Sequence, residues 1–462
     1  MDAMMDLQEA ARGADGEARG ESARVGTVST DTRTITSGAL FVALRGERFD
    51  GHEYLETARA RGAVAAMVDR RAFAHAAAAA PKLPLLVVDD TRLGLGRLAA
   101  YWRGKFKLPL IAVTGSNGKT TVKEMIFAIL ADHAGAGHAY ATPGNLNNDI
   151  GVPLTLLGLR AEHSCAVVEL GMNHPGETAY LAGIAQPTVA LVNNAQREHQ
   201  EFMRSVADVA QEHGAVISAL PADGAAVFNA DDAYADYWRG LSAPRKVLDF
   251  GIDRPAAVGG RYALSGFGSE IVLRTPQGEA EVSLRAAGVH NVRNALAAAA
   301  AAQAAGIGLA SIVRGLAGFE PVQGRLQKKA ASSGATVLDD TYNANPDSVI
   351  AAIDVLAHAA GAKFLVLGDM GEVGENGAAF HAEIGRYARA AGIDRLYLLG
   401  ELCAHAVAPF GEGALCYDDI DALLAALEPR LAVGATALVK GSRFMRMERV
   451  VQALVGSQAG GH

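Results

Sequence analysis

Short apolar runs recur through the middle of the chain, and each of them ends in polar residues. They lie at residues 109–115, 165–171 and 188–194, with the sequences PLIAVTG, CAVVELG and TVALVNN. Such runs are typical of strands buried on both faces of a parallel sheet, and the stretch 120–130 predicts a helix after the first of them. Because parallel strands gather their carboxyl ends at one edge, we expect the three polar ends to share one site.

The alternation of apolar runs and helical stretches returns after residue 336 and predicts a second α/β domain there. Before residue 109, short apolar runs alternate with Ser, Thr, Asp and Gly, which indicates strands and turns. A strand is expected at 85–88, and helices are expected at 53–62, 69–80 and 92–105.

Changes in this pattern divide the chain. The acidic, glycine-bearing start is expected to be poorly ordered, residues 225–285 form a weaker β region, and the polar stretch 321–336 is expected to be a linker. The predicted divisions are 1–24 (poorly ordered), 25–108 (N-terminal domain), 109–322 (central domain) and 323–462 (C-terminal domain). The length of 462 residues agrees, since roughly 150 residues per domain gives about three domains.

Composition and charge narrow the function classes. Half of the residues are hydrophobic and the net charge is -8, which argues against a nucleic-acid partner because phosphate neutralisation needs a basic surface. Three cysteines at no metal-ligand spacing suit a reducing cytoplasm, and the acidic start does not have the apolar core of a signal peptide. Residues 295–313 carry no charge, but alanine dominates them, so we expect a buried helix and a turn rather than a membrane insertion.

The strongest local signal is a phosphate loop between the first apolar run and its helix. It reads TGSNGKTT and comprises Thr114, Gly115, Ser116, Asn117, Gly118, Lys119, Thr120 and Thr121. Glycines let backbone N–H groups approach a triphosphate, Lys119 can reach the β- and γ-phosphates, and the Thr120 hydroxyl can bind Mg²⁺. The usual spacing would place glycine at residue 113, where this chain has Val113.

The loop alone indicates a nucleotide without indicating its use. An ordinary glycine-rich turn before a helix is the alternative structural interpretation, and switches, motors and kinases also carry phosphate loops. Many such proteins hold Mg²⁺ with an acid at the end of a second strand, and here the run 165–171 presents Glu169.

Five motifs in register resemble one family. They are 114–121 (TGSNGKTT), 144–149 (GNLNND), 169–173 (ELGMN), 290–294 (HNVRN) and 339–346 (DDTYNANP). The chain resembles the Mur ligases, the ATP-dependent amide ligases of peptidoglycan precursor synthesis. The segments STDTR at 29–33, GNLNNDIGVPLTLL, DDTYNANPDS and VKGSR are most similar to the member that joins D-alanyl-D-alanine to UDP-N-acetylmuramoyl-tripeptide.

The resemblance implies an α/β protein of three domains: an N-terminal UDP-binding domain, a central ATPase with a mostly parallel sheet, and a C-terminal Rossmann-like domain. It implies that ATP phosphorylates the terminal carboxylate of the tripeptide and that the amine of D-alanyl-D-alanine attacks the acyl phosphate. Since all the reacting groups are anionic, Mg²⁺ and cationic side chains must offset their repulsion.

The resemblance also implies roles for single residues. Lys119, His199 and Arg325 would be catalytic, and Thr120, Glu169 and His199 would hold Mg²⁺. ATP would be bound by residues 115–121 with Asn291, Asn294, Arg325 and Asp340, which places part of its site beyond the second boundary and predicts domain closure. The UDP-sugar and peptide would be bound by Ser29, Asp31, Arg33, Asn145, Asn147, Tyr342, Asn343 and Asn345, with Lys440 and Ser442 near the acceptor.

One position departs from the family pattern. The family commonly carries a lysine 14 residues after the metal-side histidine, carbamylated to give Mg²⁺-binding oxygens, and this chain has His213 there. Histidine cannot form that carbamate, although a neutral imidazole could bind a metal and Mg²⁺ prefers oxygen. Either the enzyme works without the carbamate, or another group or water supplies the oxygen.

Three other functions remain open from the sequence: another Mur-type ligase, a ligase similar to folylpolyglutamate synthetase, and a phosphate-loop switch. The segment 29–33 argues against the second, and the motifs at 31–33 and 145–147 argue against the third. We expect a monomer, and the third residue of the tripeptide and the group that takes the proton from the amine stay open.

Overall fold

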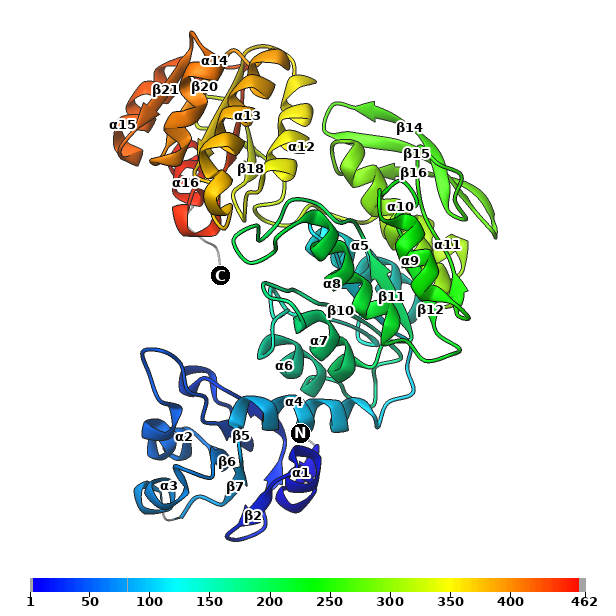
Figure 1. Ribbon diagram of the computed structural model, residues 1–462, viewed down its shortest axis with the longest axis vertical. Coiled ribbons are helices and arrows are strands. Elements are labelled where there is room, and N and C mark those ends of the chain that lie inside the picture. Colours follow the sequence, from blue (N-terminus) through cyan, green and yellow to red (C-terminus); the bar gives the residue numbers. More distant parts are fainter. Residues whose placement is uncertain (1–2, 81, 457–462) are drawn as a thin grey trace.

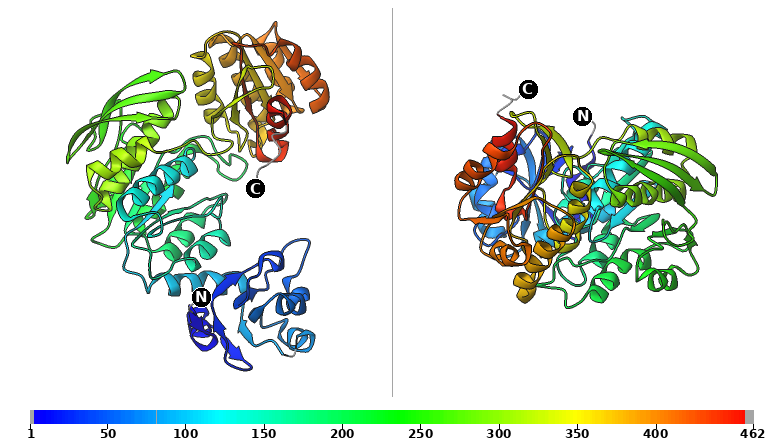
Figure 2. Two further views of the ribbon diagram at one scale, coloured as in Figure 1. Left: turned by 180° about the vertical axis from the view of Figure 1, so that it is seen from behind. Right: turned by 90° about the horizontal axis from the view of Figure 1, so that it is seen from above.

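The computed structural model describes residues 3–80 and 82–456, so residues 1–2, 81 and 457–462 of the predicted divisions lie outside the described residues. The described residues form five sheets, and the three largest follow one another along the chain, each with its own helices (Figure 1). The central part joins the other two. The N-terminal and C-terminal parts form the two tips of a C-shaped molecule, in Figure 1 and in the left view of Figure 2. No helix within the described ranges is both long and apolar enough to cross a membrane.

The N-terminal sheet has the order β2-β7-β6-β5-β4, and all its neighbours are parallel except β2 and β7. The elements are β1 (Met5–Asp6), α1 (Leu7–Ala14), β2 (Glu17–Arg19), β3 (Arg24–Val25), β4 (Thr27–Ser29), β5 (Ala39–Val42), α2 (Leu55–Ala60), β6 (Ala63–Asp69), α3 (Phe73–Ala79), β7 (Leu85–Val88) and α4 (Thr91–Arg103). The strand at 85–88 and the three expected helices are confirmed.

The expectation of a poorly ordered start is wrong for residues 3–24. Asp6 caps α1 by accepting a hydrogen bond from the Glu9 N–H, and buried Leu7, Ala10 and Ala14 form one stripe of the helix. This stripe lets α1 pack on α4. Net charge suggested disorder here, but small apolar residues at helical spacing determine the structure.

The central sheet is entirely parallel, in the order β13-β12-β11-β8-β10-β9, and a three-stranded antiparallel sheet is attached beside it. The elements are β8 (Leu110–Thr114), α5 (Lys119–Ala134), β9 (Ala139–Ala141), α6 (Gly151–Leu157), β10 (Cys165–Glu169), α7 (Glu177–Ala185), β11 (Val189–Val192), α8 (Val206–Ser218), β12 (Ala225–Phe228), α9 (Ala235–Ser242), β13 (Lys246–Val247), β14 (Gly259–Ser265), β15 (Gly268–Thr275), β16 (Gly278–Leu284), α10 (Val289–Ala304) and α11 (Leu309–Ala317). The alanine-rich segment is the buried helix α10 followed by a turn, as predicted.

The C-terminal sheet has the order β17-β18-β22-β19-β20-β21 and is parallel except for the edge strand β17. The elements are β17 (Gln327–Ala330), β18 (Thr336–Asp340), α12 (Pro346–Ala357), β19 (Lys363–Gly368), α13 (Gly377–Ala390), β20 (Arg395–Leu399), α14 (Val407–Phe410), β21 (Ala414–Tyr417), α15 (Ile420–Leu427), β22 (Thr436–Lys440) and α16 (Glu448–Val455). The linker predicted at 321–336 is therefore partly wrong, because the backbone of β17 pairs with β18.

Candidate functional site

The phosphate loop connects β8 to α5 and needs glycine at two positions. Gly115 has φ 135° and Gly118 has φ 83°, which is backbone that residues with a Cβ rarely adopt. A Cβ on Gly118 would lie 2.5 Å from Asn294 Oδ1 and 2.7 Å from Asn193 Nδ2. The Lys119 ammonium lies across the loop, 2.5 Å from the Gly115 carbonyl and 3.4 Å from Glu198 Oε2.

The ends of the three central strands meet at this loop. Asn194, just after β11, accepts a hydrogen bond from the Asn117 N–H (2.9 Å), and Asn193 donates one to the Asn117 carbonyl (2.8 Å). Glu169 ends β10 and lines the same cavity as Lys119. The sheet thus brings together side chains that are separated by long stretches of sequence.

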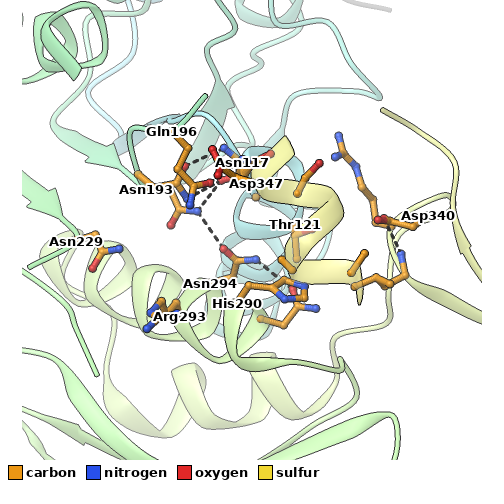
Figure 3. Close-up of a pocket in the computed structure, with 18 of the residues that line it drawn as sticks. Asn117, Thr121, Asn193, Gln196, Asn229, His290, Arg293, Asn294, Asp340 and Asp347 are labelled. Carbon is orange, nitrogen blue, oxygen red and sulfur yellow. Dashed lines mark hydrogen bonds between the residues drawn. The ribbon is translucent and has the colours of Figure 1, made fainter. Parts of the chain in front are cut away.

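A first cavity, of about 310 Å³, opens on the helix side of the loop (Figure 3). Asn294 donates to Asn291 (3.1 Å) and accepts from Asn193 (3.0 Å), so the two predicted asparagines share a face of α10 next to Gly118. His290 also lines this cavity, and burial lowers its pKa to about 4. Sequence reasoning missed the rest of this lining, which includes Asn229, Asp231, Asp232, Asp253 and Arg293.

The C-terminal part completes this cavity. Asp340 accepts a hydrogen bond from Lys440 Nζ (2.6 Å), and both side chains are nearly buried. Burial lowers the pKa of Lys440, and the Asp340 carboxylate partly offsets that effect. Arg325 stacks on the Tyr342 ring at 4.0 Å and donates to Thr120 Oγ1 (3.3 Å), which joins the two parts of the chain across the loop.

A second cavity, of about 580 Å³, lies on the other side of the loop. Its lining includes the predicted residues Ser116, Lys119, Asn147, Glu169, His199, Arg325, Tyr342, Asn343, Asn345, Lys440 and Ser442. His199 adopts φ 48°, which is uncommon for a residue with a side chain, and its Nδ1 lies 2.6 Å from Glu372 Oε2. The two cavities share Asn117, Gly118, Arg325, Ser348 and Lys440.

Glu169 has the properties of a cation ligand. It is 2 % exposed, its Oε1 accepts a hydrogen bond from Asn147 (2.7 Å), and its Oε2 has no partner among the described residues. A buried carboxylate oxygen without a partner is costly unless a cation or water satisfies it. Since Mg²⁺ prefers oxygen ligands, the residues present fit this ion.

Some predicted residues lie elsewhere. Ser29, Asp31 and Arg33 lie at the end of β4 and in the turn after it, within the N-terminal part. Arg33 forms a local ion pair with Asp31 (2.7 Å), which lowers the pKa of Asp31 to about 2. Asn145 is exposed, and among the described residues it belongs to the lining of neither cavity.

Two functional candidates were missed in the sequence, and both precede His199 on the same loop. Arg197 pairs with Asp347 (2.6 Å) of α12 and Glu383 (2.8 Å) of α13, which links the central part to the C-terminal part. Glu198 is buried beside Lys119. The histidine at position 213, where the family commonly has lysine, was the one signal in the sequence that could have led to Glu198, because His213 contacts Glu198.

Comparisons with known proteins agree with this geometry. The family descriptions "Mur ligase middle domain", "Mur ligase, glutamate ligase domain" and "Mur ligase family, catalytic domain" match residues 113–302, 324–443 and 24–103. UDP-N-acetylmuramoyl-tripeptide–D-alanyl-D-alanine ligase of Escherichia coli K12 is 43% identical over 446 residues, which cover 95% of this chain and 96% of that protein.

Two solved structures are similar over nearly their whole length. The crystal structure of MurF from Acinetobacter baumannii has a TM-score of 0.88 and 33% identity, and the match covers 97% of this chain and 98% of that one. MurF ligase from Thermotoga maritima in complex with ADP has a TM-score of 0.80 and 26% identity, with 93% and 96% covered. This chain belongs to the Mur ligase family.

Proposed function

We propose that this chain is the ATP-dependent ligase that joins D-alanyl-D-alanine to UDP-N-acetylmuramoyl-tripeptide in peptidoglycan precursor synthesis. One observation carries the proposal: the phosphate loop lies where a nucleoside-sized cavity meets a larger one, and Arg325 and Lys440 line both. A phosphoryl group held at this junction can pass from a nucleotide in the first cavity to a carboxylate in the second.

The residues suit a transfer between anions. We assign the triphosphate to the backbone of residues 115–121 and to Lys119, and we assign the nucleoside to the cavity lined by Asn291, Asn294 and Asp340. Arg325 reaches the junction with an Nε that is buried and unpaired within the described structure, so a donor is free for an incoming phosphate oxygen. Mg²⁺, held by Glu169 with His199 and Thr120 near the loop, would neutralise phosphate charge.

The chemistry follows from these positions. A carboxylate oxygen of the tripeptide attacks the γ-phosphorus, the bond to the bridging oxygen of ADP breaks, and an acyl phosphate forms. The amine of D-alanyl-D-alanine then attacks the acyl carbon, loses a proton, and phosphate leaves as the amide forms. Lys119, Lys440 and Arg325 hold the anions close to one another, and positioning of this kind supplies most of the catalysis in phosphoryl transfer.

The remaining assignments are part of the same proposal. Tyr342, Asn343 and Asn345 would face the peptide end with Asn147, whereas Ser29, Asp31 and Arg33 would hold the UDP end from the distant N-terminal part. We further propose that the chain acts in the cytoplasm, where ATP is supplied, and that it acts as a monomer.

The test is phosphate release with Mg-ATP while each substrate is omitted in turn. We expect release to need both UDP-N-acetylmuramoyl-tripeptide and D-alanyl-D-alanine, and mass spectrometry to find the UDP-linked pentapeptide. Equal release without either substrate would favour a nucleotide switch and refute the proposal. Folate with glutamate should give no product.

A further inference from the structure

A line of buried hydrogen bonds leads from the end of β8 to the loop that carries His199. Thr114 Oγ1 lies 2.9 Å from His213 Nδ1 and shares a hydrogen bond with it, and the N–H at His213 Nε2 donates to Glu198 Oε1 (2.7 Å), because a carboxylate accepts. His213 is fully buried in α8. Because both ring nitrogens have partners, the imidazole is not a free metal ligand, and what it does is hold one oxygen of Glu198.

The other oxygen of Glu198 faces the phosphate site. Glu198 Oε2 lies 3.4 Å from Lys119 Nζ and 3.7 Å from His199 Nε2. Only 6 % of the side chain is exposed, so its oxygens face these neighbouring groups rather than bulk solvent.

Glu169 independently indicates a ligand at the same place. It lines the same cavity as Glu198, Lys119 and His199, and its Oε2 is buried without a partner among the described residues. Both acids thus have one oxygen fixed by a neighbouring side chain, Asn147 for Glu169 and His213 for Glu198. Fixed carboxylate oxygens are ligands that Mg²⁺ prefers, and partners of this kind orient them.

We propose that Glu198, positioned by His213, supplies a carboxylate oxygen to the Mg²⁺ site of the phosphate loop in place of a carbamylated lysine. The inference rests on the proposed function for the identity of the reaction. The glutamate side chain supplies the Mg²⁺-binding oxygens, so no lysine of this chain needs to react with CO₂. His213 is a positioning residue, and Glu198 is the ligand.

The first test measures metal binding without substrates, by titrating the full chain with Mn²⁺ and following the free ion by electron paramagnetic resonance. Glu198→Gln keeps the size of the side chain and an acceptor for His213, and we expect it to weaken Mn²⁺ binding about tenfold or more. His213→Leu should weaken it too, and His213→Gln, which keeps an N–H donor, should recover part of the loss. The matched control is Glu201→Gln, since Glu201 is an exposed acid on the same loop.

Melting curves separate a metal effect from a folding effect. If Glu198→Gln does not fold, Glu198→Asp replaces it, because it keeps the charge and withdraws the oxygens from the loop. Mn²⁺ binding equal to that of the unchanged chain in a folded Glu198 variant overturns the proposal.

The second test concerns CO₂. After equilibration with ¹³C-bicarbonate we expect no lysine carbamate resonance, and removal of CO₂ should leave phosphate release unchanged. A carbamate resonance together with a loss of activity on CO₂ removal overturns the inference. Neither the metal titration nor the resonance needs the two substrates, so failure of the proposed function would appear only in the omission experiment.

Discussion

Arg197 is predicted to hold the central and C-terminal parts together over the site. Its guanidinium pairs with Asp347 Oδ1 (2.6 Å) and Glu383 Oε2 (2.8 Å), and it packs over the Phe380 ring at 5.3 Å. The loop that carries it also carries Glu198 and His199. The perturbation is Arg197→Met, which keeps the apolar stem and removes the charge. The Asp347 carboxylate keeps the hydrogen bond from the Arg197 backbone N–H (2.8 Å), so it still has a donor in the variant.

The free energy of the contact between Arg197 and its two acidic partners depends on how far the three side chains are exposed. Hydrogen bonds to charged groups are worth about 1.5–3 kcal/mol when shielded, and exposed ion pairs about 0–1 kcal/mol. The side chains of Arg197, Asp347 and Glu383 are 24%, 22% and 36% exposed, so solvent screens them partly. We therefore expect about 1–2 kcal/mol for the contact, which is a factor of about 5–30 in the ratio of closed to open chains.

Two assays check this prediction. Small-angle X-ray scattering without nucleotide should show a larger radius of gyration for Arg197→Met, and kcat/KM should fall by up to the same factor of about 5–30, because it follows the fraction of closed chains. High salt screens the ion pair, so it should raise the radius of gyration and lower the kcat/KM of the unchanged protein towards the values of the variant. Arg204→Met is the control, since that side chain is 92% exposed on the same loop. Unchanged scattering and kcat/KM in Arg197→Met would refute the reasoning.

Three further predictions concern single contacts. Gly118→Ala places a Cβ 2.5 Å from Asn294 Oδ1 at φ 83°, so calorimetry should show ADP binding weakened or lost. Lys440→Met leaves the buried Asp340 carboxylate unpaired and should cost about 3–5 kcal/mol in urea unfolding, with much of it recovered when Asp340→Asn is added; a single-variant cost within error would contradict this. Burial lowers the pKa of His290 from 6.5 to about 4, so the unfolded chain takes the proton first as pH falls. The stability is therefore full above 6.5 and lost between 6.5 and 4, and His290→Gln should abolish that part of the slope in urea unfolding against pH.

Long apolar elements could be predicted from the sequence because burial determines them. The runs that became β8, β10 and β11 are fully buried and apolar apart from polar residues at their ends, such as Glu169, and their shared edge followed from parallel pairing. Edge strands could not be predicted in this way. β17 has the sequence QKKA, and its residues are alternately half-buried and exposed. Only its pairing with β18 makes it a strand, because the sequence around it is that of a linker.

The site was predictable where one segment of chain carries the chemistry. The phosphate loop needs only its own glycines and Lys119, and the sequence shows both. Glu198 and Arg197 depend on partners brought in from α8, α12 and α13, and a lone acid or arginine in a polar loop carries no sign of that. Asp31 and Arg33 are the reverse case, since a family pattern marks them while the structure shows a local ion pair.

The division of the site between two parts of the chain has a chemical reason if an acyl phosphate forms there. Water attacks an acyl phosphate as an amine does, so the site must exclude water once the phosphoryl group has moved. The phosphate loop cannot do this, because the approach that admits ATP also admits water. Arg325, Tyr342 and Lys440 cover the junction from the C-terminal part, and Arg325 reaches the Thr120 hydroxyl (3.3 Å). We predict that opening this contact would admit substrates and that closing it would supply the cations, so that one movement would both order binding and protect the intermediate.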